Sequence, residues 1–143
     1  MKATAMLEKK MDSPLHSRDT VIQFDEGLIG FSDCKEFVLM ENDEIAPFRR
    51  LQSVDRPDVG FLVIDPSLIV PDYHSMIPQR EWASLELSSP AAGIALAICI
   101  IGPSSAESTG NLQAPLIINY ERMAGKQIIL TDTQMTSRQP LLS

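Results

Sequence analysis

One apolar run constrains the fold more than any other part of this sequence. Residues Ile94–Ile101 contain no charged side chain. In an extended strand successive side chains point to opposite faces, so the large and the small residues of this run separate. The large set is Ile94, Leu96, Ile98 and Ile100, and the small set is Ala95, Ala97 and Cys99. Because both faces are apolar, the run predicts a central strand covered on both sides, with the small face allowing another layer to approach closely.

Prolines and glycines divide the rest of the chain into short extended runs. Together with the central run they give about eight strand candidates, separated by turns and without a long amphipathic helix. The other candidates are Val21–Phe24, Glu36–Met40, Phe48–Val54, Gly60–Ile64, Leu68–Val70, Leu116–Ile118 and Ile128–Leu130. Gln79–Leu85 fits one or two helical turns, although Trp82–Leu87 fits a strand equally well. This pattern predicts an all-β, single-domain fold, an antiparallel β-barrel-like structure or a sandwich with short helical turns.

The last two strand candidates predict a hairpin. A polar segment joins them, and its one glycine, Gly125, is expected to supply the positive φ that such a turn often needs. Pro115 has no N–H to give a strand ladder, so it belongs at the first position or the open edge of its strand. Earlier in the chain, Gly27 and Gly30 mark a turn after the first strand, and Asp65-Pro66 marks a turn that ends the fourth.

Length and composition favour one domain. A chain of 143 residues with 44% hydrophobic content can bury a core of its own. We expect residues 1–18 to be a flexible leader and residues 19–143 to be the β domain. The first residues lack the apolar region of a secretory signal, and the longest apolar run is too short to span a bilayer. With Cys34 and Cys99 in no metal-ligand spacing, we expect two reduced, partly buried thiols in a cytoplasmic protein.

The charge is concentrated in one segment. The net charge of −7 argues against direct nucleic-acid binding, which needs clustered Lys and Arg. Residues 19–44 contain eight acidic residues and one basic residue, while the rest of the chain has 11 of each. The acidic residues are Asp19, Asp25, Glu26, Asp33, Glu36, Glu41, Asp43 and Glu44. The segment is either a solvated acidic edge that keeps the protein soluble or a docking surface for a basic partner.

No catalytic constellation is visible in the sequence. It contains neither a phosphate-binding loop nor a nucleophile elbow, so we expect no catalytic residues and no cofactor. Asp72 and His74 have the spacing of two ligands on one face of an extended segment, but a solvated Tyr73–His74 pair in a loop is the preferred interpretation. The strand amides Gln52, Asn119 and Gln127 either satisfy the backbone at strand irregularities or face a partner.

Four stretches, in order and at compatible spacing, resemble the flagellar assembly factor family FliW. They are Phe24-x-x-Gly27-Leu28-x-Gly30-Phe31; Leu51-Gln52-Ser53 leading to Phe61-x-Val63-x-Asp65-Pro66; Asn111-Leu112-x-Ala114-Pro115-Leu116-Ile117-Ile118-Asn119; and Gly125-Lys126-Gln127-x-Ile129-Leu130 with Arg138-x-Pro140-Leu141. The resemblance covers residues 21–141. It departs from the family at Ile29, where proline is usual, at Gly110, where alanine is common, and at Met135, where an aromatic residue is usual.

The resemblance implies a non-enzymatic, cytoplasmic regulator of flagellum biogenesis that works by binding proteins. Members of this family hold newly made flagellin, like a chaperone, and bind the carbon storage regulator CsrA, an RNA-binding translational repressor. Antagonism of CsrA relieves repression of flagellin mRNA, and accumulated flagellin competes for the factor. This is a switch by mass action, because the partner in excess sets the free concentration of the other.

The expected contact residues combine the acidic segment with polar strand positions. They are Asp25, Glu26, Asp43, Glu44, Gln52, Asn111, Asn119 and Gln127. We expect no direct contact with nucleic acid or membrane. The alternative is a small β-barrel oxidoreductase that binds flavin or another cofactor in a pocket formed by the loops after Asp65 and Gly102.

Overall fold

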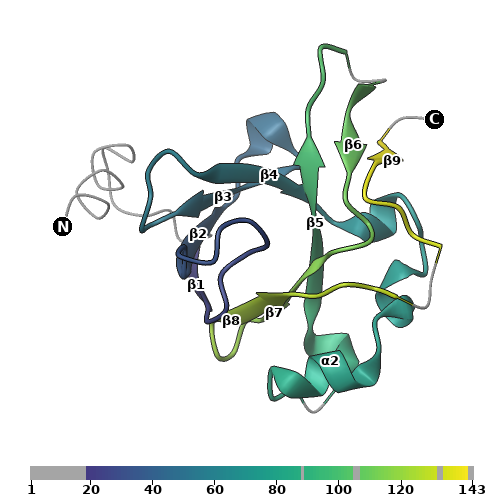
Figure 1. Ribbon diagram of the computed structural model, residues 1–143. Coiled ribbons are helices and arrows are strands. Elements are labelled where there is room, and N and C mark those ends of the chain that lie inside the picture. The colour runs from purple at the N-terminus through teal and green to yellow at the C-terminus, as the bar shows by residue number, and fades with distance from the viewer. Residues whose placement is uncertain (1–18, 88, 105–106, 132–133, 142–143) are drawn as a thin grey trace.

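The central strand of the fold is β5 (Ile94–Ile100), and three other strands pair with it (Figure 1). The structure is a computed structural model, and it describes residues 19–87, 89–104, 107–131 and 134–141. On one side β5 pairs with β4 (Gly60–Ile64). On the other side it pairs first with β7 (Leu116–Asn119) and then with the short β6 (Thr109–Gly110). The expected central strand is therefore present.

The described residues form a closed ring of seven strands in the order β4-β3-β2-β1-β8-β7-β5, with β5 returning to β4. The remaining members are β1 (Thr20–Phe24), β2 (Glu36–Met40), β3 (Arg49–Ser53) and β8 (Ala124–Gln127). Beyond the ring, β6 pairs with β9 (Gln139–Pro140), which extends the sheet. The predicted all-β barrel is confirmed.

One pairing in the ring differs from the antiparallel expectation. β1 and β8 are parallel, with Gln23 opposite Ala124 and Phe24 opposite Gly125. A ring with an odd number of strands cannot alternate in direction all the way round, so at least one neighbouring pair must be parallel. In this protein that pair joins the first strand to the last hairpin and closes the barrel.

Two apolar layers hold the barrel together. Inward side chains such as Phe24, Phe37 and Leu96 fill the interior, where the Phe24 and Phe37 rings meet edge to face at 5.5 Å. The second layer covers the outside of β5 and β7 and contains Trp82 and Tyr73, both fully buried. The predicted separation of large and small residues on β5 is confirmed: the large ones face the interior and the small ones face this outer layer. The exception is Ile100, which is 61% exposed because the ladder between β5 and β4 ends at Cys99.

The last hairpin is tighter than predicted. The second strand is β8 at Ala124–Gln127, not Ile128–Leu130, and Met123 takes the positive φ (52°) that was expected of Gly125. Gly125 instead lies within β8, where a Cβ atom would come within 2.8 Å of the Phe24 ring. Glycine is needed at this position for close packing with β1 and not for the turn.

Short helices connect the strands. They are η1 (Asp43–Ile45), η2 (Pro66–Leu68), η3 (Tyr73–Met76), α2 (Gln79–Ser84) and η4 (Pro90–Ala92). Side chains of η3 and α2 (Tyr73 and Trp82) cover the outside of β5 and β7. The expectation of an extended piece at Leu68–Val70 is wrong, because the Asp65 side chain accepts the Ser67 N–H at 2.9 Å and starts η2. Of the two interpretations of residues 79–87, the helical one is confirmed. None of the helices in the described residues has the length and hydrophobicity needed to cross a membrane.

Candidate partner-binding surfaces

The acidic segment divides into two surfaces. Asp25 and Glu26 follow β1, whereas Asp43 and Glu44 follow β2. Because β1 and β2 pair antiparallel, these two acidic pairs lie at opposite ends of the hairpin. A strand of five residues at about 3.3 Å per residue separates them by roughly 15 Å. The four carboxylates expected in one contact region therefore belong to two regions.

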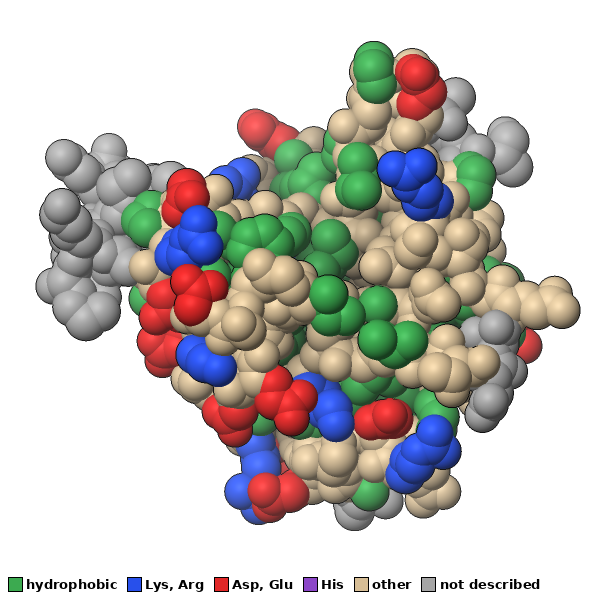
Figure 2. Space-filling model, in the orientation of Figure 1, with side chains coloured by type: hydrophobic (Ala, Val, Ile, Leu, Met, Phe, Trp, Pro, Cys, Tyr) green, Lys and Arg blue, Asp and Glu red, His purple; other side chains and the backbone are tan. Residues whose placement is uncertain are grey.

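The first surface, which we name the acidic cluster, surrounds two basic side chains. Its acidic members are Asp25, Glu26, Asp33, Glu36, Asp55 and Asp58, and its basic members are Lys35 and Arg56, a net charge of −4. Arg56 contacts the Asp58 and Asp33 carboxylates at 3.3 and 3.6 Å. The Asp55 carboxylate accepts the Lys35 and Glu36 N–H groups at 2.8 and 3.1 Å. Figure 2 shows acidic side chains gathered along the left and lower-left edge of the molecule, interleaved with Lys and Arg.

The loop after β1 holds the acidic cluster at one end of the barrel. Gly27 and Gly30 have φ values of 67° and 86°, which confirms the predicted turn. Leu28 turns into the core, and the Phe31 ring meets Phe61 edge to face at 5.4 Å. The Asp25 and Glu26 side chains remain exposed on the outside of this packed loop.

The second surface borders an apolar hollow. The Asn42 side chain accepts the Glu44 N–H at 2.8 Å and starts η1, so that Asp43 and Glu44 are exposed in its first turn. The chain continues into Pro47 and Phe48, which form one wall of the hollow. We name this hollow the outer groove; it has a volume of about 390 Å³. Its other main apolar side chains are Ile64, Ile101 and Leu141.

Two of the expected contact residues are not on the surface. Gln52 is 1% exposed, and its Nε2 donates to the carbonyls of Ser53, Pro57 and Val59 at 2.9–3.2 Å. Asn119 is 2% exposed, and its side chain donates to the Leu85 carbonyl at 2.8 Å. The expectation that these amides face a partner is therefore wrong. They satisfy buried backbone groups.

Asn111 and Gln127 are half-buried and hold the same piece of backbone. The Asn111 Oδ1 accepts the Ala114 N–H at 3.0 Å, and the Gln127 Nε2 donates to the Ala114 carbonyl at 2.9 Å. Gln127 also accepts the Ile29 N–H at 2.8 Å, which ties the loop after β1 to β8. Both side chains therefore hold the backbone at Ala114, and Gln127 also holds the loop that carries part of the acidic cluster.

The expectation that Tyr73 and His74 form a solvated pair in a loop is wrong, because both lie in η3, Tyr73 is buried and His74 is half-buried. Tyr73 is fully buried and donates its hydroxyl to the Leu112 carbonyl. Burial raises the pKa of this hydroxyl well above its usual range. His74 stacks on Trp82 at 4.8 Å and its Nε2 lies 3.1 Å from the Gly93 carbonyl. Among the described residues, no three His, Cys, Asp or Glu side chains are grouped to hold a metal ion.

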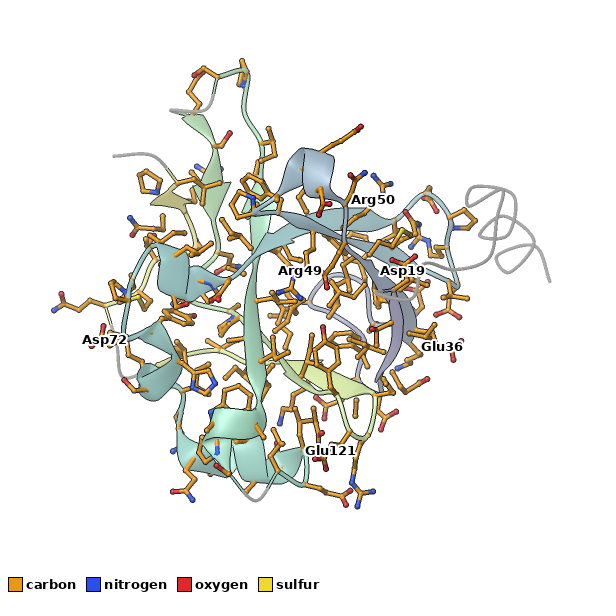
Figure 3. The ribbon with its side chains drawn as sticks, turned by 180° about the vertical axis from the view of Figure 1, so that it is seen from behind. Asp19, Glu36, Arg49, Arg50, Asp72 and Glu121 are labelled. Atoms are coloured by element: carbon orange, nitrogen blue, oxygen red, sulfur yellow. The ribbon has the colours of Figure 1, made fainter. Side chains whose placement is uncertain are left out.

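A second hollow lies at the barrel mouth. It is lined by a basic side chain, Arg49, that the sequence analysis did not single out. Arg49, Asp65, Ser67 and His74 are among its lining residues, and its volume is about 290 Å³. Arg49 shares the strand parity of the inward Leu51, so it lies over the interior of the ring, and Arg50 lies outside (Figure 3). The two-residue spacing of Arg49 and Leu51 on one strand is the sequence signal that could have placed Arg49 at this site. Arg49 donates to the Tyr120 hydroxyl at 3.4 Å across the mouth.

The two loops proposed for a cofactor pocket do not form one together. Asp65 and Ser67 line the hollow at the barrel mouth, whereas Gly102 and Ser104 line the outer groove. Both cysteines are buried and unpaired, as expected. Burial raises the pKa of the Cys99 thiol to about 11.

Comparison with known proteins gives a consistent result. The sequence model of the FliW protein family matches residues 6–141, beginning inside the segment expected to be a leader. The flagellar assembly factor FliW of Natranaerobius thermophilus is 37% identical over 128 residues, covering 89% of this chain and 85% of that protein. The FliW of Leptospira interrogans serovar Lai is 34% identical over 127 residues, covering 88% of this chain and 85% of its own.

A solved structure agrees with the sequence comparison. The crystal structure of a flagellar assembly factor FliW superposes with a TM-score of 0.80 at 30% identity, covering 92% of this chain and 91% of that one. The agreement extends over the barrel and the segments that cover it, so sequence and fold identify the same family. This chain belongs to the FliW family of flagellar assembly factors.

Proposed function

We propose that this protein binds flagellin and the translational regulator CsrA in the cytoplasm, and that its binding to CsrA relieves repression of flagellin mRNA. The observation that carries the proposal is family membership over nearly the whole chain. The proposed action is binding alone, without a catalytic step. When flagellin accumulates it competes for the protein, and the released CsrA represses translation again.

The acidic cluster is the surface we propose for steering the encounter with CsrA. A protein that binds RNA carries Lys and Arg side chains for the phosphates. The acidic cluster has the opposite charge, and Asp25 and Glu26 at its edge are exposed. Complementary charge raises association rates more than it raises affinity, and salt screens the effect.

The first experiment tests binding itself. The purified full chain is used as bait in a lysate of flagellated cells, and retained proteins are identified by mass spectrometry. We expect flagellin and CsrA to be retained, and we expect added purified flagellin to release CsrA. Retention of neither protein would overturn the proposed function.

The second experiment tests the acidic cluster. The double variant Asp25→Asn/Glu26→Gln is compared with Asp72→Asn/Glu121→Gln, which removes two exposed carboxylates elsewhere (Figure 3). We expect the first variant to associate with CsrA about threefold to tenfold more slowly at low salt, with a flatter salt dependence, and the second to behave like the parent. Equal association rates for both variants would exclude the acidic cluster.

A further inference from the structure

We infer that the outer groove is a docking site for a protein segment that inserts large apolar side chains into it and places Lys or Arg beside it. The inference rests on the proposed function and assigns the docking of CsrA to the outer groove, as distinct from the steering of its approach that we propose for the acidic cluster. Four observations support it: the construction of the groove, its lack of orienting polar groups, its exposed apolar side chains and the sign of the charges at its rim.

The groove lies where the chain of β5 extends beyond the end of its pairing with β4. The ladder between β4 and β5 ends at Cys99, while the chain continues through Ile100 and Ile101 into a hairpin that projects beyond the ring (Figure 1). Ile64 on β4 forms part of the floor. Phe48 stands on one side, and Leu141, held by its N–H to the Ser108 carbonyl at 3.0 Å, stands on the other. Three distant segments of the chain therefore form its walls.

The lining of the groove favours an apolar occupant over a polar small molecule. Sites for small molecules combine apolar walls with a few convergent polar groups that orient the ligand. None of the described residues that line this groove is charged. The Ser108 hydroxyl already donates to the Ser104 carbonyl at 3.3 Å and accepts the Gly102 N–H at 3.1 Å. The Ser104 hydroxyl donates to the Glu107 carboxylate at 3.3 Å.

The apolar side chains at this place are unusually open to water. Ile101 in the groove is 51% exposed, and Phe48 and Leu141 beside it are half-buried. Covering these side chains would remove apolar surface from water, which is the main favourable contribution to protein association. Contiguous exposed apolar surface with a polar rim is typical of a protein-binding site.

Carboxylates outnumber basic side chains next to the groove. Glu44 lies in η1, three residues before Pro47, and Glu107 lies between the two lining serines in the sequence; both are exposed. The basic side chain on the outer face of β3, Arg50, donates to the Gln52 Oε1 at 3.1 Å. A segment with Lys or Arg beside its apolar anchors complements this arrangement, whereas an acidic segment is repelled. Of the two proposed partners, the RNA-binding regulator is the one whose own activity requires Lys and Arg at its surface.

The test uses two groove variants with matched controls, and purified CsrA as the probe. Ile101→Lys places a charge in the groove, and Ile129→Lys makes the same change at an isoleucine that is 56% exposed outside it. Glu44→Lys reverses a charge at the rim of the groove. Its control, Glu121→Lys, reverses an exposed charge in the β7–β8 turn, outside the groove. We expect Ile101→Lys to raise the Kd for CsrA about tenfold or more, and Glu44→Lys to raise it about threefold, mainly through slower association. The two controls should leave the Kd within about twofold, and melting temperatures should show that all four variants fold.

The outcomes separate this inference from the proposed function. If the parent protein binds CsrA but Ile101→Lys binds it as tightly as Ile129→Lys, the groove assignment is wrong and the proposed function stands. If the parent binds neither CsrA nor flagellin, both are wrong. A parent dimer that Ile101→Lys dissociates, or a small molecule that copurifies and is lost in Ile101→Lys, would also overturn the assignment. Loss of CsrA binding supports the groove, and flagellin binding measured on the same variants shows whether the two sites overlap.

Discussion

Two buried side-chain amides, Gln52 and Asn119, form hydrogen bonds mainly with the backbone of segments that lie outside regular strands and helices. Gln52 on β3 satisfies three carbonyls, one on its own strand and two in the loop to β4. Asn119 at the end of β7 joins the Leu85 carbonyl after α2 to the N–H groups of Glu121 and Arg122 in the hairpin turn. Each amide replaces several water contacts that the buried backbone has lost, so its removal leaves those groups without partners.

Asn119→Ala should therefore lower the free energy of unfolding by about 2 kcal/mol, because buried backbone groups lose their partners. Urea unfolding of the variant measures the loss. Gln23→Ala, at an exposed amide on β1, is the control and should change stability by less than about 0.5 kcal/mol. Equal effects of the two changes would show that the Asn119 bonds contribute nothing net.

Gly125→Ala should be more costly than Gly30→Ala. At Gly125 the added methyl group would lie 2.8 Å from Phe24 and 3.1 Å from the Ile117 carbonyl, inside a packed layer, and we expect a loss of about 2–3 kcal/mol. At Gly30 nothing lies within 4 Å, so only the positive φ is penalised, by about 1 kcal/mol. Thermal unfolding of both variants checks the order, and the reverse order would contradict the packing role assigned to Gly125.

At the scale of elements, a lysine on β8 adds polar contacts to the apolar packing of α2 against the barrel. Lys126 on β8 contacts the Glu81 carboxylate at 3.3 Å and the Ser84 hydroxyl at 3.1 Å. The side chains of this ion pair are 26% and 23% exposed, whereas those of Arg122 and Glu86 nearby are 59% and 64% exposed. Solvent and salt screen the second pair more strongly.

Lys126→Met should cost about 1 kcal/mol of stability, and Arg122→Met should cost close to nothing. Hydrogen exchange of the α2 amides should increase in the first variant and remain unchanged in the second. Global stability is measured by chemical unfolding at two salt concentrations. If the two methionine variants are indistinguishable in both measurements, the greater burial of the Lys126 pair has no energetic consequence.

Elements with a regular period were predictable, and those fixed by side-chain bonds were not. β5 followed from its alternation of large and small residues, and β2 and β4 were predicted with their observed bounds. η2 was missed because the Asp65 cap overrides the extended preference of the residue before Pro71. The shift of β8 toward the turn depends on its pairing with β1, a contact about 100 residues away that no local pattern records.

The candidate surfaces were also hard to predict from the sequence, because they depend on how distant segments pair. The acidic segment is continuous in the sequence, but antiparallel pairing of β1 and β2 sends its two exposed pairs to opposite ends. Gln52 and Asn119 look polar and available in the sequence, yet both are buried by loops that fold back over them. The outer groove combines Phe48, Ile101 and Leu141, and no spacing rule connects residues so far apart.

At the scale of the whole molecule, alkaline pH should destabilise the fold because two buried groups, the Cys99 thiol and the Tyr73 hydroxyl, lose their protons. Burial raises the pKa of Cys99 from 9.0 to about 11 and that of Tyr73 above its usual range. Both groups ionise more readily in the unfolded chain, so the stability they contribute is complete below pH 9 and is lost as the pH rises through the folded-state pKa values. Cys99→Ala should reduce the fall in melting temperature between pH 9 and 11. An identical fall in both proteins would contradict this assignment.

The parallel pairing of β1 with β8 also sets when the protein becomes competent during its own synthesis. Residues 20–24 leave the ribosome early, but their partner strand, residues 124–127, lies near the end of the chain. At about 5–20 residues per second, translation of the intervening segment takes roughly 5–20 s. Throughout that interval the β1 edge has no β8 to pair with and the ring is open. Each new molecule therefore closes its barrel only after its last hairpin has been made, and under the proposed function it can bind its partners only from that moment.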